Sequence, residues 1–169
     1  MKFVADEMLG KLARWLRVMG LDIVHRRPFP DSALIETARS ENMIILTRDS
    51  KILGENERAR RRSPGGNPDM IEVWAVEEDL PFYQMVSIVR RMNLDPLERA
   101  FTRCAACNGS LIERTGKEVE GRVPPFVFAN VKEYRECLSC NKIYWAGTHR
   151  ARIERILAEV KEAASEPMT

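Results

Sequence analysis

The chain lacks any long hydrophobic run. No stretch among its 169 residues approaches the roughly 18 uncharged apolar residues that a membrane-spanning helix requires. Asp6 and Glu7 interrupt the first apolar stretch, and the residues after them do not follow the pattern of a secretory signal peptide. We therefore expect a cytoplasmic protein with no membrane partner, in a reducing compartment where paired cysteines serve as metal ligands.

Several motifs of nucleophilic and nucleotide-dependent catalysis are also missing. The sequence contains no G-x-S-x-G, no Walker loop and no G-x-G-x-x-G. Its net charge of +2 at pH 7 provides little overall attraction for nucleic acid. The basic surplus lies in residues 1–70, where thirteen Lys and Arg outnumber ten Asp and Glu. Any contact with phosphates must therefore come from local basic patches.

Four cysteines occur as two pairs in the last third of the chain. Two residues separate Cys104 from Cys107 and Cys137 from Cys140, and an asparagine follows each pair. Zn²⁺ favours four thiolates in a tetrahedron, and Asn tolerates the left-handed backbone that each turn requires. We predict a zinc ribbon whose ion has four protein ligands and is therefore structural. A redox dithiol or buried free cysteines are the alternatives.

Residues 1–95 alternate the patterns of strands and helices. Four short apolar runs have the length of strands: 3–5, 22–24, 43–47 and 71–76. The third is continuous, as in a strand that is buried on both faces. Helical spacing follows over residues 8–19 until Gly20, a second helix follows Asp31 as its N-cap, and Pro81 begins a third. This alternation predicts an α/β domain with a mainly parallel sheet, of PIN-like type by the resemblance described below.

The pattern changes after residue 95. The segment 96–165 holds the cysteine pairs among short β-like pieces and ends in an amphipathic helix, so we predict a zinc ribbon with a terminal helix. The β-like pieces are residues 111–112, 125–131 and 142–145. Residues 54–69 combine glycines, prolines and an arginine run with few apolar residues, and we expect a mobile loop there.

Three aspartates are the candidates for catalysis. Asp6 and Asp49 each follow an apolar strand, and the carboxyl ends of parallel strands meet at the edge where open α/β folds bind ligands. Asp31 begins a helix whose N-terminus can lie over that edge. Their oxygens suit Mg²⁺ or Mn²⁺, which activate water for phosphodiester hydrolysis. We interpret the three as metal-binding catalytic residues, although each alone is equally well explained as a helix cap or turn residue.

Other acids could complete such a site, and the sequence does not rank them: Glu7, Glu36, Asp69 and Asp79. Basic residues lie near the three aspartates. Lys11, Arg14 and Arg17 recur at helical spacing after Asp6, and Arg48 directly precedes Asp49. We interpret these four as RNA-binding residues that contact the phosphate backbone. A solvated helix face is the alternative.

Aromatic side chains gather after the second cysteine pair. Tyr144 and His149 are candidates for stacking on unpaired bases of RNA, as aromatic groups do in single-strand recognition. For Trp145 we expect packing against the cysteine turns and the last helix instead.

The run 3–17 (FVADEMLGKLARWLR) resembles the opening of the PIN-like RNase family named after the C-terminal domain of the Mut-seven exonuclease. Asp31 before a helix, the run 44–49 (IILTRD), the two cysteine pairs and the run 143–149 (IYWAGTH) match it in the same order. The resemblance covers most of the chain and departs from the family mainly in residues 54–69. It implies a PIN-type nuclease fold fused to a zinc ribbon, with metal-dependent ribonuclease activity at acidic residues. Asp6, Asp31 and Asp49 match in position, and a fourth acid has no clear counterpart.

Together these features predict a ribonuclease that hydrolyses RNA phosphodiester bonds with catalytic Mg²⁺ or Mn²⁺ and structural Zn²⁺. A non-catalytic RNA-binding or ribosome-associated adaptor is the alternative, with the ribbon as its binding part. A phosphoryl-acceptor fold such as a response-regulator receiver also places acids after strands. The ribbon and the lack of an evident strand-end lysine argue against that third reading.

Overall fold

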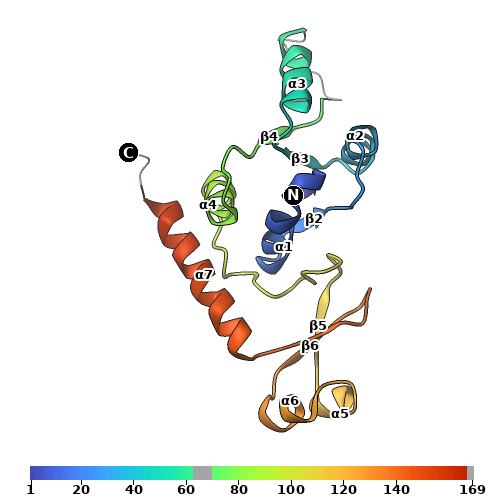
Figure 1. Cartoon of the computed structure of the whole chain (residues 1–169), viewed down its shortest axis with the longest axis vertical. Helices are drawn as coiled ribbons and strands as arrows, with labels where there is room; N and C mark the ends of the chain where they lie inside the picture. Colours follow the sequence, from blue (N-terminus) through green and yellow to red (C-terminus); the bar gives the residue numbers. More distant parts are fainter. Residues whose placement is uncertain (63–69, 167–169) are drawn as a thin grey trace.

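A computed structural model describes residues 1–62 and 70–166 and contains a four-stranded parallel sheet (Figure 1). Its strands, in the spatial order β2-β1-β3-β4, are β1 (Lys2–Ala5), β2 (Asp22–Val24), β3 (Ile44–Thr47) and β4 (Val73–Ala75). β1 is central, since Phe3 pairs with Ile23 of β2 on one side and with Ile44 of β3 on the other. The predicted parallel α/β sheet is confirmed.

Helices cover both faces of this sheet. They are η1 (Glu7–Leu9), α1 (Gly10–Val18), α2 (Asp31–Ser40), α3 (Ser50–Arg62) and α4 (Pro81–Met92). Phe3 and Leu46 share a core with residues of α1 and α4, whereas Val4 and Ile45 share another with residues of α2 and α3. Alternate residues of a strand point to opposite faces, so both faces of β1 and β3 are buried and their sequences are continuously apolar.

The end of α1 receives the segment that leads into the ribbon. Gly20 ends the helix as expected, with φ of +85°, and a Cβ there would lie 2.3 Å from the carbonyl oxygen of Arg99. Only glycine combines that backbone with such a close approach. The N–H of Phe101 then donates to the carbonyl oxygen of Val18 at 2.8 Å. The second half of the chain therefore starts in direct contact with α1.

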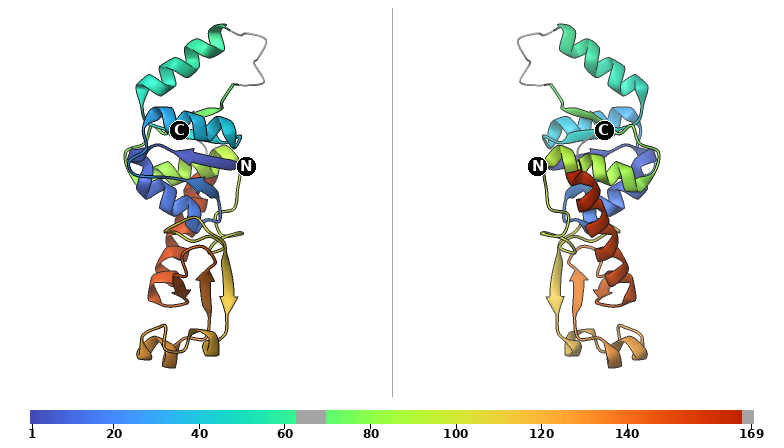
Figure 2. Two further views of the ribbon diagram at one scale, coloured as in Figure 1. Left: turned by 90° about the vertical axis from the view of Figure 1, so that its right-hand side faces the viewer. Right: turned by 90° about the vertical axis from the view of Figure 1, so that its left-hand side faces the viewer.

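Between α4 and the last helix, the chain forms a small antiparallel sheet that extends away from the first domain (Figure 2). The strands of this sheet are β5 (Leu111–Arg114), β6 (Tyr134–Cys137) and β7 (Ile143–Trp145). Two short helices, α5 (Gly116–Val119) and α6 (Pro125–Asn130), lie in the chain between β5 and β6. Glu136 is buried in this sheet and accepts hydrogen bonds from Arg122 and Arg114, which hold the pKa of its carboxyl at about 2. The predicted fold class, an α/β domain with a small C-terminal ribbon, is confirmed.

The last helix, α7 (Thr148–Ser165), returns from the ribbon to the first domain (Figure 1). It packs along α4, and its Leu157 and Val160 are fully buried in the core that contains Phe3. Arg90 of α4 donates to two carbonyl oxygens in the last turn of α7. The predicted amphipathic helix is confirmed. The division into two domains at residue 95 stays a prediction, and α7, which follows that residue, shares the core of the first domain. No described helix has the length and apolarity to span a bilayer.

Three local predictions are wrong. Residues 54–62 continue α3 instead of forming a loop, because Glu, Ala and Arg favour helix and the Glu57–Arg61 ion pair links successive turns. The rest of that predicted loop, residues 63–69, lies outside the described part of the chain. Residues 125–130 form α6, with proline in the first turn where a helix tolerates it. Asp31 is the first residue of α2 rather than its N-cap, a position that Pro30 takes.

Candidate functional site

The four cysteines converge where the ribbon meets the first domain. Their sulfur atoms all lie within 4.8 Å of one another. The sulfurs of Cys107 and Cys137 are 3.4 Å apart, and those of Cys104 and Cys140 are 3.7 Å apart. Within residues 1–62 and 70–166, no other group of three or more His, Cys, Asp or Glu is gathered in this way. Four cysteine sulfurs at this spacing are a donor set that fits Zn²⁺.

The two cysteine turns have the same backbone geometry. The asparagine after each pair has a positive φ, 72° at Asn108 and 57° at Asn141, as the sequence predicts. Each asparagine N–H donates to the carbonyl oxygen of the first cysteine of its turn at 2.9 Å. A Cβ at Gly109 would lie 2.9 Å from the sulfur of Cys137, so a side chain there would push the two turns apart.

The cysteine cluster favours a bound cation electrostatically. Burial raises the pKa of the Cys104 thiol. Hydrogen bonds from the Tyr144 hydroxyl and from backbone N–H groups outweigh that effect and lower the pKa to about 6. Burial and the hydrogen-bonded Cys137 thiol instead raise the pKa of Cys107 to about 12. The pKa values of Cys104 and Cys107 are therefore shifted in opposite directions. A divalent cation held by the four sulfurs would supply positive charge that stabilises the thiolate forms.

Arg17 connects the first cysteine turn to the first domain. Its side chain is buried, and its guanidinium donates to the carbonyl oxygens of Ile23 (3.1 Å) and Ala106 (2.9 Å). Burial lowers the pKa of Arg17, and the negative charge of nearby cysteine sulfurs counteracts that effect. The Asn108 side chain adds two bonds to the edge of β2, accepting from the N–H of Ile23 and donating to Asp22. The cysteine turn is thus bonded to both α1 and β2.

This position of Arg17 corrects part of the predicted RNA-binding face. Lys11 and Arg14 are exposed on α1, as expected of residues that contact phosphate. Arg17 is 6% exposed and bonded to backbone carbonyl groups, so its guanidinium does not reach the solvent-facing surface. Arg17 belongs to the basic repeat in the sequence, but the segment with the first cysteine turn covers its side chain.

Asp6 lies at the carboxyl end of β1 and is almost fully hydrogen-bonded. Its Oδ1 accepts the N–H of Met8 at 2.9 Å, so it caps η1. Its Oδ2 accepts the Thr47 hydroxyl and the N–H of Arg48, the latter at 3.0 Å. The side chain is thus held between β1 and β3, at the strand edge where the sequence predicts the site. Three donors leave this carboxylate about one of its roughly four acceptor positions.

Asp49 and Asp31 are connected to the same edge through Thr47 and Lys51. The N–H of Asp49 donates to the Thr47 hydroxyl at 2.9 Å, so one side chain contacts both Asp6 and Asp49. Asp49 Oδ1 accepts the N–H of Lys51 at 2.7 Å, and the Lys51 ammonium lies 3.6 Å from a carboxylate oxygen of Asp31. The three aspartates are therefore neighbours along one edge, but in the described residues they do not form a group close enough to hold one ion.

The additional acids have other partners. Glu7 accepts bonds from Arg27 and from the N–H of Phe29, which fixes the segment before α2. Asp79 pairs with Arg48, so this predicted RNA-binding residue is partly neutralised. Glu36 is exposed on α2, and Asp69 lies outside the described residues. None of these contacts identifies a fourth metal ligand.

The aromatic residues after the second cysteine pair lie around one pocket, and Trp145 is more exposed than expected. The Tyr144 hydroxyl lies 3.0 Å from the sulfur of Cys104, beside the cysteine cluster. Trp145, for which we expected packing, is 38% exposed. Tyr144, Trp145 and His149 all line one pocket between the ribbon and α7. Tyr144 and His149 are the two residues that the sequence predicts to stack on bases.

Sequence reasoning missed two residues at the strand edge and one at the pocket. Thr47 and Lys51 connect the three aspartates, but a threonine at a strand end and a lysine in a helix carry no specific signal. Lys132 lines the pocket from the segment before β6. The only signal in the sequence for Lys132 is its position two residues before β6 of the ribbon.

Comparison with known protein families supplies one match. The family described as the Mut7-C RNAse domain matches residues 1–157, which run from the start of the chain into α7 and include both the strand edge and the four cysteines. No curated protein and no solved structure matches the chain significantly.

Proposed function

The chain belongs to the Mut7-C RNAse domain family, and from that premise we propose that it is a metal-dependent ribonuclease. In this proposal, Asp6, Asp31 and Asp49 bind Mg²⁺ or Mn²⁺, and Cys104, Cys107, Cys137 and Cys140 bind a structural Zn²⁺. The observation that carries it is the Thr47 hydroxyl, which donates to the Asp6 carboxylate and accepts the backbone N–H of Asp49 at the carboxyl ends of β1 and β3. Ligand sites of open α/β folds lie at this edge.

The chemical type of the three acidic ligands suits a divalent ion. All three side chains offer carboxylate oxygens, the ligands that Mg²⁺ and Mn²⁺ prefer. Among the described residues, Asp31 has a single ionic partner and Asp49 accepts a single hydrogen bond, so both keep free acceptor positions. A divalent ion bound there would lower the pKa of a coordinated water and stabilise negative charge on a phosphate.

The chain's own residues position the acids and the substrate. Thr47 and the N–H of Arg48 hold the Asp6 carboxylate, and Lys51 holds Asp31. Lys11 and Arg14 are exposed on α1, the helix that follows Asp6, where they can contact phosphates on either side of the scissile bond. Arg48 joins them when its ion pair with Asp79 opens; that pair is exposed on the Asp79 side and therefore weak.

A second candidate is a non-catalytic RNA-binding adaptor. One observation favours it: protein donors already occupy both oxygens of Asp6, and the described aspartates do not gather around one point. In that case the three acids serve as helix caps and ion-pair partners, while the basic face of α1 and the ribbon bind RNA.

Cleavage of end-labelled single-stranded RNA with added Mn²⁺ tests the proposal. We expect Asp49→Asn to lower the rate on the order of 100-fold, because a metal ligand loses its charge. Asp31→Asn is expected to act in the same direction. Asp49 and Asp31 suit this test better than Asp6, whose substitution also disturbs three structural hydrogen bonds.

Glu159→Gln is the control, because Glu159 is an exposed acid on α7 with no ion pair among the described residues. It should cleave as the wild type does. Equal cleavage by the wild type and by both aspartate variants would overturn the assignment of the site. RNA binding without cleavage by the wild-type protein would favour the adaptor.

A further inference from the structure

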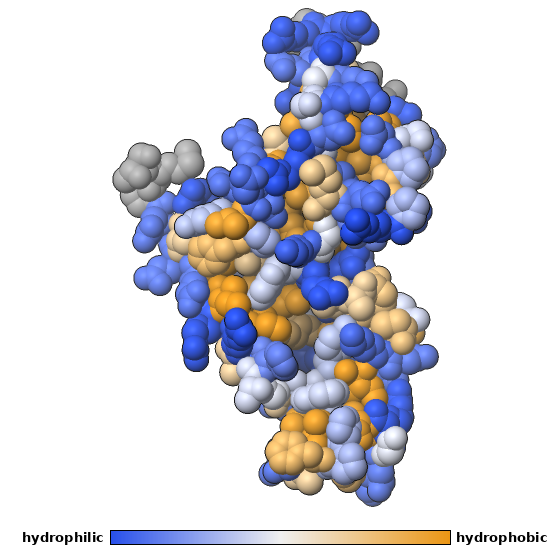
Figure 3. All heavy atoms as spheres, in the orientation of Figure 1, coloured by the Kyte–Doolittle hydropathy of each residue, from blue (hydrophilic) through white to orange (hydrophobic). Residues whose placement is uncertain are grey.

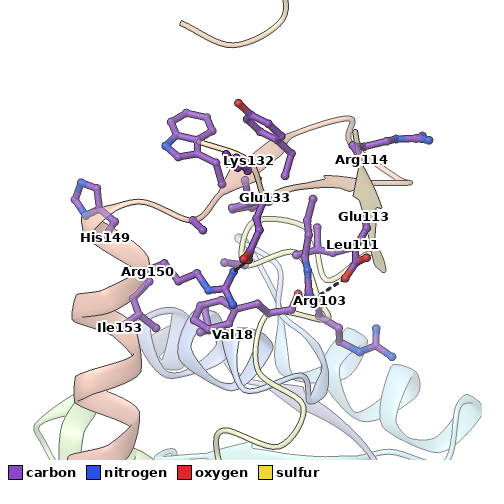
Figure 4. A pocket seen from close by; sticks show the side chains of 17 residues that line it. Val18, Arg103, Leu111, Glu113, Arg114, Lys132, Glu133, His149, Arg150 and Ile153 are labelled. Carbon is purple, nitrogen blue, oxygen red and sulfur yellow. Dashed lines mark hydrogen bonds and ion pairs between the residues drawn. The ribbon is translucent and has the colours of Figure 1, made fainter. Parts of the chain in front are cut away.

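A pocket of about 550 Å³ opens where the ribbon, the end of α1 and the start of α7 meet (Figure 4). Its walls are largely apolar, with Val18 from α1, Phe101 from the connecting segment, Leu111 from β5 and Ile153 from α7. Trp145 also lines it, with more than a third of its side chain exposed. Figure 3 shows a hollow in the surface at this junction. Such a volume accommodates a flat ring with its attached groups.

Two basic side chains of the pocket remain available to a ligand, while two arginines are paired with glutamates. Arg150 pairs with Glu133 at 2.8 Å (Figure 4), and Arg135 pairs with Glu113 at 3.4 Å. The side chains of Lys132 and His149 line the same pocket, and neither side chain has a hydrogen-bond or ion-pair partner among the described residues. A ligand that combines an aromatic ring with an anionic group would satisfy both the apolar wall and these two side chains.

The pocket also lies along the basic face of α1. Lys11, Arg14 and Val18 follow one another at three- and four-residue spacing, so they share one side of the helix. Lys11 and Arg14 are exposed near the acidic edge, and Val18 lines the pocket. The length of α1 from Gly10 to Val18 corresponds to about 12 Å. An RNA strand that follows this face from the acids therefore reaches the pocket away from the bond being cleaved.

We propose that this pocket binds one unpaired nucleotide of the RNA, with its base against Trp145 and a phosphate near Lys132 and His149. The inference rests on the proposed function, since it takes RNA as the substrate. A paired base does not fit this role, because its faces are covered by neighbouring bases in the duplex. The pocket would thus make the protein select single-stranded segments next to the site of cleavage.

Binding of fluorescent RNA without added Mg²⁺ or Mn²⁺ tests the pocket independently of cleavage. We expect Trp145→Ala to weaken binding of a short single-stranded RNA roughly tenfold, through loss of base stacking. Lys132→Ala should weaken it less and reduce the slope of log affinity against log salt by about 1, through loss of one phosphate contact. An abasic nucleotide at one position of the RNA should reproduce the loss, and Trp145→Ala should then add nothing further.

Phe126→Ala and Lys117→Ala are matched controls in the same ribbon. Phe126 is 77% exposed and Lys117 is exposed, and neither lines the pocket. Both variants should bind RNA as the wild type does. The pocket proposal is wrong if Trp145→Ala binds single-stranded RNA as tightly as the wild type, whether or not the wild type cleaves it. A wild type that binds RNA but cleaves none overturns the nuclease alone, and a wild type that binds no RNA overturns both.

Discussion

The cysteine cluster and the acidic edge both gather side chains that can bind metal, but the two groups find their partners differently. The four sulfur atoms lie within 4.8 Å of one another and contact mainly each other. The three aspartates accept bonds from protein donors instead: a hydroxyl, several backbone N–H groups and the ammonium of Lys51. One group is organised around a point, and the other is organised along an edge.

The chemistry of the two ligand types explains this difference. A thiol is a weak hydrogen-bond partner, so a cation would stabilise four packed thiolates more than protein donors do, even though Cys104 receives such bonds. A carboxylate accepts strong hydrogen bonds and is equally useful as a helix cap, as Asp6 and Asp49 demonstrate. We therefore expect the cysteine cluster to depend on its ion for structure, and the acidic edge to keep its structure without one.

Removal of zinc should have the largest effect on the structure of the protein. It tests whether the cysteine cluster depends on its ion while the acidic edge does not. We expect one Zn²⁺ per chain by elemental analysis, bound with an apparent free energy of about 10 kcal/mol or more at pH 7. Chelation should unfold the ribbon, as measured by the loss of protection of ribbon amides in hydrogen exchange. The acidic edge should respond little to removal of Mg²⁺. A ribbon that stays protected after its metal is removed would contradict the comparison.

Arg17 tests the connection between the two regions, with a smaller expected effect. Arg17→Met removes a buried guanidinium and leaves backbone carbonyl oxygens without donors, at a cost of about 3 kcal/mol in the free energy of unfolding. Arg14→Met, on the exposed face of the same helix, should change stability by only about 0.5 kcal/mol. Denaturant unfolding measures both. Similar losses in the two variants would mean that the connection through Arg17 contributes little.

Thr47 tests the acidic edge itself and should have the smallest effect of the three. Thr47→Val keeps the shape of a fully buried side chain but removes the hydroxyl that bonds Asp6 and Asp49. We expect a loss of about 2 kcal/mol in the free energy of unfolding, typical of a hydrogen bond to a charged group. Thr37→Val, which lies on α2 and bonds only a helix carbonyl, is the control. An unchanged stability of Thr47→Val would show that the edge is not held by its hydrogen bonds.

Local patterns in the sequence predicted most of the sheet and the cysteine turns. The apolar runs of β1 and β3 indicated strands buried on both faces, and the asparagines after the cysteine pairs indicated a left-handed backbone. The predictions failed where local signals conflict. Charged residues 54–62 suit an exposed helix as well as a loop, and residues 125–130 combine β-favouring side chains with a proline that begins a helix.

By itself, the sequence determined the spacing of the ligands: two sulfurs per turn, one acid after each of two strands, and a basic repeat on α1. Only the tertiary structure decided which members of each set are free to act. Arg17 and Arg14 belong to the same repeat, yet the ribbon buries one and leaves the other in solvent. Tyr144 and Trp145 are adjacent, but the hydroxyl of the first contacts the sulfur of Cys104 while the second is exposed at the pocket. The physical reason is that chain periodicity sets which residues share a face, whereas the packing of distant segments decides what covers that face.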